Sequence, residues 1–160
     1  MRNLLFGLLA ALVLGSGAAF AQTGAWVGLS GGYPGAALHF GVEDIVTDGL
    51  DVRVNVGYAY AGADGASFGA DALYGLDVDT GEVPVNVYVG GGAGLVFGKA
   101  VAVKALVGGE YRLGDIGIEE LGVFLEVGPS LGFDIDGDDA TDEGGFGFDA
   151  RLGVNYHFDF

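Results

Sequence analysis

The clearest pattern in the chain is the stretch Leu50-Asp51-Val52-Arg53-Val54-Asn55-Val56-Gly57-Tyr58-Ala59-Tyr60. Its even-numbered positions are apolar or aromatic, whereas its odd-numbered positions carry Asp, Arg, Asn, Gly and Ala. Side chains alternate between the two faces of a β-strand, so this period of two predicts a strand with one apolar and one polar face.

The same period recurs along most of the chain, and helical periodicity is nearly absent. Alternating segments cover 68–78, 83–89, 101–107, 121–127 and 146–160, and two weaker segments cover 25–33 and 36–42. Turn sequences rich in Gly, Asp and Pro separate them, such as Tyr33-Pro34-Gly35 and Asp79-Thr80-Gly81. The sequence therefore predicts an all-β chain of eight strands.

The composition excludes several classes of protein. The 160 residues include 33 Gly, 51% hydrophobic and only 18% charged residues, with a formal net charge of -16. A chain this acidic repels phosphate, which argues against binding to nucleic acid. So much apolar side chain argues against disorder, and the absence of Cys from the sequence excludes disulfides and thiolate chemistry.

Residues 1–21 have the organisation of a secretory signal peptide. Met1-Arg2-Asn3 supplies a basic start, Leu4 to Leu14 form an apolar core, and Ala19-Phe20-Ala21 fits the small-x-small cleavage rule. A retained membrane helix needs about 20 apolar residues, and Gly15-Ser16-Gly17 interrupts the run too early. We therefore expect a signal peptide at 1–21 and one exported domain at 22–160.

Alternation alone does not say which face meets solvent, so the choice depends on what each face carries. A soluble sheet hides its apolar face, whereas a membrane barrel turns it toward lipid. The polar face here holds mostly small residues with a few charges of both signs, including Arg53, Lys104, Arg112 and Arg151. A soluble surface is normally more densely charged. We therefore expect residues 22–160 to form an eight-stranded antiparallel up-and-down transmembrane β-barrel with a paired polar interior; a soluble β-domain is the alternative.

Aromatic residues offer a second test of the membrane interpretation. Assigned to the apolar face near one rim are Tyr58, Tyr60, Phe68, Phe97, Phe133 and Phe146, and near the other Trp26, Tyr111, Tyr156, Phe158 and Phe160. Two aromatic girdles flanking an aliphatic band are typical of the two water–lipid interfaces.

The signal, the eight alternating segments and the last strand together resemble the small eight-stranded outer-membrane barrels of the OmpA/OmpX type. The last strand resembles the signal that their assembly machinery recognises, in the spacing of Arg151, Gly153, Tyr156 and Phe158, with Phe160 at the end. The resemblance implies an outer-membrane location with both ends of the mature chain in the periplasm. It implies outer-membrane lipid and the barrel-assembly machinery as partners. It supplies no catalytic motif.

Two features suggest catalysis, but each has a simpler explanation. Gly128-Pro129-Ser130-Leu131-Gly132 matches the G-x-S-x-G elbow, which requires a strand–turn–helix context. Ser130 instead falls on the polar face of a strand. His39 and His157 also fall on that face, and we expect them to be structural.

An acidic segment at residues 134–143 is the one unusual loop. It carries Asp134, Asp136, Asp138, Asp139, Asp142 and Glu143. Alternating Asp residues resemble a calcium loop, but the sixth position is Asp139 instead of Gly and the twelfth is Gly145 instead of Glu. A solvated loop and a weak Ca²⁺ site both remain open, and no other cofactor is expected.

These observations predict a non-enzymatic outer-membrane barrel with a structural or surface-interaction role in the cell envelope. Eight strands leave an interior that side chains fill, which argues against a wide pore. A cation-binding or narrow-conductance barrel is the alternative, and a lipid-modifying barrel enzyme is a third possibility.

Overall fold

Eight β-strands make up a computed structural model that describes residues 24–61, 64–81, 83–135 and 145–158. The predicted signal peptide at 1–21 lies outside these residues. The strands are β1 (Ala25–Tyr33), β2 (Gly35–Val42), β3 (Leu50–Ala59), β4 (Gly65–Leu76), β5 (Val85–Val96), β6 (Ala100–Arg112), β7 (Leu121–Asp134) and β8 (Gly145–Phe158). A 3-10 helix, η1 (Leu113–Ile116), follows β6.

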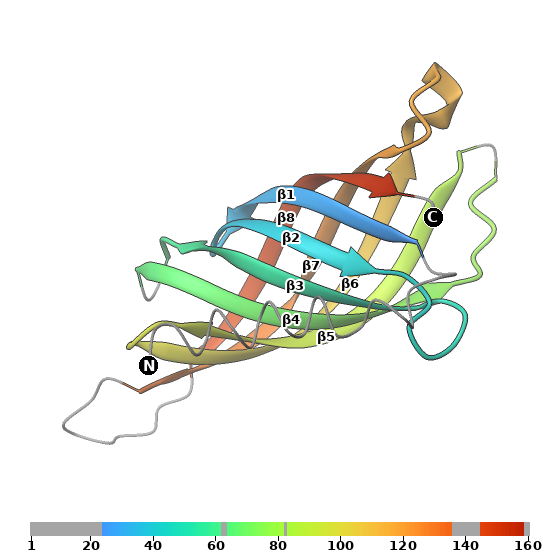
Figure 1. Ribbon diagram of the computed structural model, residues 1–160. Coiled ribbons are helices and arrows are strands. Elements are labelled where there is room, and N and C mark those ends of the chain that lie inside the picture. The colour runs from blue at the N-terminus through green and yellow to red at the C-terminus, as the bar shows by residue number, and fades with distance from the viewer. Residues whose placement is uncertain (1–23, 62–63, 82, 136–144, 159–160) are drawn as a thin grey trace.

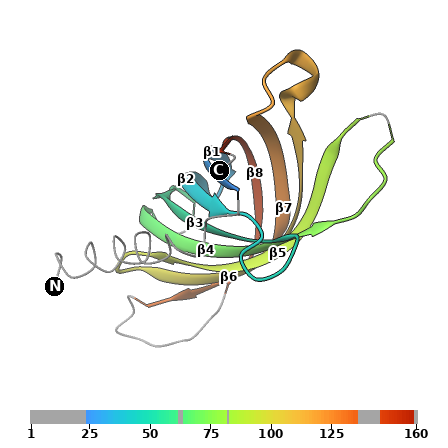
Figure 2. The same ribbon diagram turned by 45° about the vertical axis from the view of Figure 1, so that its right-hand side comes forward.

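The strands form one closed sheet. Each strand is antiparallel to the next in sequence, and β8 returns to pair with β1 from Ala25↔Phe158 to Tyr33↔Ala150 (Figure 1). Figure 2, turned from that view, shows the strands curving around one interior. The prediction of an eight-stranded antiparallel up-and-down barrel is confirmed. In the part of the chain that the structure describes, no helix has the length and apolarity needed to span a membrane.

The two ends of the barrel differ in the length of their connections. At one end β1 and β2 are separated by Pro34 alone, and residues 97–99 join β5 to β6. We call this end the turn rim. The opposite end, the terminal rim, holds both described chain ends and the connections 43–49, 77–84 and 113–120 (Figure 1).

Apolar side chains cover the outside of the wall. Leu38, Val56 and Leu152 are 62%, 56% and 60% exposed, whereas Arg53, Asp71 and Glu126, which lie on the inner faces of their strands, are at most 2% exposed. Water therefore reaches the apolar face and is kept from the charged one, which is the reverse of a soluble sheet. At these positions the period of two in the sequence identified both faces correctly.

Strand β5 is displaced from its predicted range. It begins at Val85, just after Pro84, and it continues through the glycine-rich stretch 90–94 to Val96. A Cβ atom at Gly92 would lie 2.1 Å from Asp71 Oδ1 and 2.4 Å from the Ala70 carbonyl oxygen. The absence of a side chain at Gly92 therefore leaves space for the buried Asp71 carboxylate. The glycines at 90–94 do not interrupt the strand.

The predicted place of Trp26 on the outer face is wrong. Its side chain is 4% exposed and lies inside the barrel, with its ring centroid 5.9 Å from that of His157. A Cβ at Gly41, the register partner of Trp26 on β2, would lie 2.1 Å from the indole ring. The glycine leaves a flat surface that the indole covers, and a large ring then fills this end of the interior.

The other aromatic assignments agree with the structure where it describes exposed rings. Tyr58, Tyr60 and Phe146 are 55%, 54% and 78% exposed near the turn rim. Tyr156 and Phe158 are 45% and 38% exposed near the terminal rim. Phe160 lies outside the described residues.

Candidate functional site in the barrel interior

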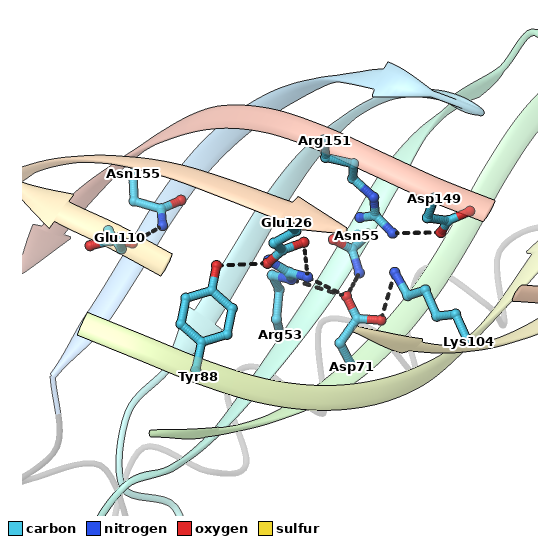
Figure 3. Close-up of polar contacts among 10 residues, drawn as sticks. All are labelled: Arg53, Asn55, Asp71, Tyr88, Lys104, Glu110, Glu126, Asp149, Arg151 and Asn155. Atoms are coloured by element: carbon cyan, nitrogen blue, oxygen red, sulfur yellow. Dashed lines mark hydrogen bonds and ion pairs between the residues drawn. The ribbon is translucent and has the colours of Figure 1, made fainter. Parts of the chain in front are cut away.

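A buried ion cluster closes the middle of the barrel. Arg53 on β3 donates from Nε and Nη2 to Asp71 Oδ2, at 3.0 and 2.8 Å. It donates from Nη1 and Nη2 to Glu126 Oε1 and Oε2, at 2.6 and 3.0 Å. One guanidinium thus bridges carboxylates on β4 and β7, and charge-assisted bonds of this length are strong (Figure 3). We call Arg53, Asp71 and Glu126 the central cluster.

Three further side chains complete the polar contacts of the two carboxylates. Asn55 donates to Asp71 Oδ2 at 2.9 Å, and Tyr88 donates to Glu126 Oε1 at 2.9 Å. Lys104 Nζ lies 2.9 Å from Asp71 Oδ1. Five strands, β3 to β7, therefore contribute to one network. The polar-face parity identified Lys104, Asp71 and Glu126, but it did not identify Tyr88, which stands on that face among the valines of β5.

Apolar side chains seal the barrel between the central cluster and the terminal rim. Phe124 is 1% exposed and lies 5.3 Å, centroid to centroid, from the ring of His39. Leu73 and Leu106 are also buried and belong to the same packed group as Trp26. An open pore would expose its lining to water, and these side chains are not exposed. Among the described residues, the interior is therefore blocked from the central cluster to the terminal rim.

A second polar group lies at the terminal rim. His157 places Nε2 2.6 Å from Glu110 Oε1 and Nδ1 3.0 Å from Glu43 Oε1. Arg112 Nη2 lies 3.1 Å from the same Glu43 oxygen, and Asn155 donates to Glu110 Oε2 at 2.5 Å. The hydrogen bond with His157 is the main cause that lowers the pKa of Glu43 below its ordinary value, with Arg112 contributing and burial opposing. These contacts connect the β2–β3 loop to β6 and β8.

Ser130 and the two histidines, which suggested catalysis in the sequence, lie far apart in the barrel. Ser130 pairs with Gly147 on β8, whereas His39 pairs through Gly28 with Asn155 on the same strand. At about 3.3 Å per residue, that separation is roughly 26 Å along β8. A hydroxyl nucleophile needs its base within hydrogen-bond reach, so neither His39 nor His157, which lies two residues farther along β8, serves Ser130.

The interior is hollow between the central cluster and the turn rim. This cavity has a volume of about 500 Å³. Its walls consist largely of small residues on the inward parity, namely Gly35, Ala37, Gly69, Gly94, Ala102 and Gly147. Its polar lining includes Ser30, Asn55, Lys104, Asp149 and Arg151. Small side chains leave the space near the turn rim, and large ones fill the barrel near the terminal rim.

The predicted acidic metal site falls almost entirely outside the described residues. Of its six members, Asp134 is described, as an exposed residue at the end of β7 that lines the cavity. Asp136, Asp138, Asp139, Asp142 and Glu143 lie outside that range. Within the described residues, no group of three or more His, Asp or Glu side chains could hold a metal ion. The calcium site stays a prediction.

Arg151, Gly153, Tyr156 and Phe158 of the predicted assembly signal lie on β8, and Phe160 lies outside the described residues. Arg151 and Gly153 face the interior, and Arg151 Nη2 lies 3.4 Å from Asp149 Oδ2. Tyr156 and Phe158 face outward, with ring centroids 5.0 Å apart. The aromatic pair is therefore presented together on the outer surface of one strand.

Comparison with solved structures supports the architecture. The chain is similar to the N-terminal β-barrel domain of OprF from Pseudomonas aeruginosa, with a TM-score of 0.50 and 16% identity over 86% of this chain and 98% of that one. It also matches Neisserial surface protein A (NspA), with a TM-score of 0.41 and 15% identity over 87% and 95%. No family model and no curated protein matches the sequence. The first likeness confirms, at the level of the fold, the resemblance to small eight-stranded outer-membrane barrels.

Proposed function

We propose that this chain is a non-enzymatic outer-membrane β-barrel with a structural or surface-interaction role in the cell envelope. The observation that carries the proposal is the inverted wall, apolar and exposed outside, charged and buried inside. Exposing this much apolar surface to water is unfavourable, and lipid removes the cost. The aromatic residues near both rims fit the two interfaces of a bilayer.

The blocked interior supports a structural role over conductance. Ions would have to pass Arg53 and Phe124, each of which is 1% exposed. The narrow-conductance alternative would require the central cluster to separate, and its short bonds oppose this. The separation of Ser130 from both histidines likewise gives no support to a lipid-modifying enzyme.

Fractionation of cells that express the full chain tests the location. The protein should sediment with outer membranes and resist extraction by high salt or carbonate, because its outer wall lies in lipid. The signal peptide at 1–21 should be absent from the mature protein by mass spectrometry. Recovery of a folded soluble periplasmic pool would contradict the proposal.

Cysteine labelling tests the orientation, since the sequence contains no native Cys. We propose that the terminal rim faces the periplasm. Lys99→Cys on the turn rim should then react with a membrane-impermeant maleimide on intact cells. Val46→Cys, 80% exposed on the terminal rim, should react only after the outer membrane is permeabilised. The opposite pattern would reverse the orientation.

The outward pair Tyr156 and Phe158 is proposed as the contact for the barrel-assembly machinery, together with Arg151, Gly153 and Phe160. Replacing Tyr156 and Phe158 with Ala should lower the amount of assembled barrel in cells while leaving refolding in detergent largely intact. Phe148→Ala is the matched control, because Phe148 is an outward, 53% exposed aromatic on the same strand. Equal assembly defects in the two variants would show that general loss of aromatic surface is the cause.

A further inference from the structure

We propose that the cavity at the turn rim binds a small carboxylate whose apolar body lies against the Ala and Gly walls. Its volume of about 500 Å³ lies within the range of small-molecule sites, which combine apolar walls with a few converging polar groups. The floor groups are Ser30, Asn55, Lys104, Asp149 and Arg151. The site is separate from the outer wall, on which the proposed envelope role depends.

Two floor residues have buried polar atoms that lack a protein partner. Ser30 is 2% exposed and Asn55 is 7% exposed. Within the described chain, no hydrogen bond reaches Ser30 Oγ or Asn55 Oδ1. An unsatisfied buried polar atom costs about 1–3 kcal/mol, so atoms of this kind beside a cavity indicate that something polar completes them. Ser30 Oγ can donate to an acceptor on a ligand inside the cavity, whereas Asn55 Oδ1 is itself an acceptor, which a bound water can satisfy.

The balance of donors and acceptors on the floor selects the chemistry of that ligand. A lysine ammonium has three N–H groups and an arginine guanidinium five. Lys104 has one ion-pair contact, with Asp71 at 2.9 Å, and Arg151 has one, with Asp149 at 3.4 Å. The second distance is longer than the usual 2.7–2.9 Å of a charge-assisted bond. Lys104 and Arg151 therefore keep N–H groups that their carboxylate partners do not use, and these donors favour a ligand end rich in acceptor oxygens.

A monoanion fits this floor better than a dianion. Lys104 and Arg151 lie on the same side of Arg53 (Figure 3). Each already faces one carboxylate, so the two cations together neutralise little further charge. A carboxylate has two oxygens that can meet an ammonium and a planar guanidinium at once. The Ser30 hydroxyl adds a third donor.

The walls determine the rest of the ligand. Backbone groups in a closed barrel are already paired within the sheet, so walls of Ala37, Gly69 and Ala102 offer almost no hydrogen bonds. The body of the ligand should therefore be apolar and compact, such as a phenyl ring on a short chain. Its entrance lies at the turn rim, where Pro34 and Ala61 belong to the lining.

Calorimetry on the refolded full barrel in a non-ionic detergent tests the proposal. The probe is 3-phenylpropanoate, and 3-phenylpropanol and 3-phenylpropylammonium share its carbon skeleton. The carboxylate should bind at least about tenfold tighter than the alcohol, since charge-assisted bonds replace neutral ones, and the ammonium should not bind. Equal binding of all three, which is the behaviour of detergent partitioning, would overturn the proposal, and so would no binding of the carboxylate.

Two variants, with one matched control, locate the site. Ala102→Leu fills the cavity without removing any charged group, and Val103→Leu is its matched control on the outer face of the same strand. The first should abolish binding of 3-phenylpropanoate and the second should leave it unchanged. Arg151→Gln should weaken binding about tenfold or more while the barrel still shifts in mobility on boiling. Binding that survives Ala102→Leu in a folded barrel would place the ligand elsewhere and refute the assignment.

Discussion

Arg53 carries its charge at a place where only 1% of its surface meets water. Removing such an ion from water costs several kcal/mol, and good geometry to paired carboxylates is required to offset it. The two carboxylates of the central cluster provide four hydrogen bonds to this one guanidinium. All four are 3.0 Å or shorter only because β3, β4 and β7 present their side chains to the same point. The residue and the closed sheet therefore depend on each other.

Replacing Arg53 by Met should destabilise the barrel strongly. The variant leaves Asp71 and Glu126 as buried charges without their shared partner, for which the expected cost is about 3–5 kcal/mol. Urea unfolding in detergent micelles, followed by the shift in tryptophan fluorescence of Trp26, measures it. Arg151→Met is the comparison, because its single contact with Asp149 is 3.4 Å long and more exposed. Equal losses in the two variants would show that position in the network does not matter.

Glu43 should contribute to a loss of stability in acid. Because its pKa is lowered in the folded state, its carboxylate stabilises the barrel above its ordinary pKa of 4.5. That contribution disappears as pH falls from there through the lower folded pKa. Thermal melts from pH 7 to pH 3 should therefore show a smaller decline in Tm for Glu43→Gln than for the native chain. Asp48→Asn, an exposed acid of the same loop, is the control and should follow the native curve.

At the scale of the strand, the alternating pattern was sufficient to predict most of the fold. The stretch from Leu50 identified a strand and assigned Arg53 to the interior, because both follow from a period of two. Trp26 was misplaced because its apolar character suggested lipid, and the glycine that receives it, Gly41, lies on another strand. The partners of Arg53 and the cavity could not be predicted from the sequence. The alternating pattern assigns a side chain to the inside or the outside of the barrel, but only the register between strands determines which side chains meet there.

Placing an arginine on the outer wall should have a cost that depends on depth. Val54 lies in the middle of β3 and Val101 near the turn-rim end of β6, and both side chains point outward. Val54→Arg should cost about 2–4 kcal/mol and Val101→Arg about 0–1 kcal/mol in a lipid bilayer. Reversible unfolding from phospholipid vesicles gives both values. A cost near zero for Val54→Arg would mean that this face does not meet lipid.

For the whole molecule, closure predicts resistance to detergent. Every strand has two neighbours, so no free edge offers a starting point for unfolding. The unboiled protein should migrate faster than the boiled protein in a dodecyl sulfate gel. A chain that lacks residues 145–160 cannot close, and it should run at one position with or without heating. If the full chain showed no shift, closure of the barrel in solution would be disproved.

The pairing of Ala25 with Phe158 has one more consequence, which concerns the connectivity of the chain. Strands β1 and β8 pair along their length as the other neighbouring strands do, although no connection of the chain joins them. The position of the chain ends is therefore not what holds this part of the barrel wall together. A circular permutant, joined from β8 to β1 by a short linker and opened at the exposed turn Asp79–Gly81, should refold to the same heat-modifiable barrel, since adjacent ends and surface turns tolerate such changes. The fold of the barrel would then not depend on which strand comes first in the chain.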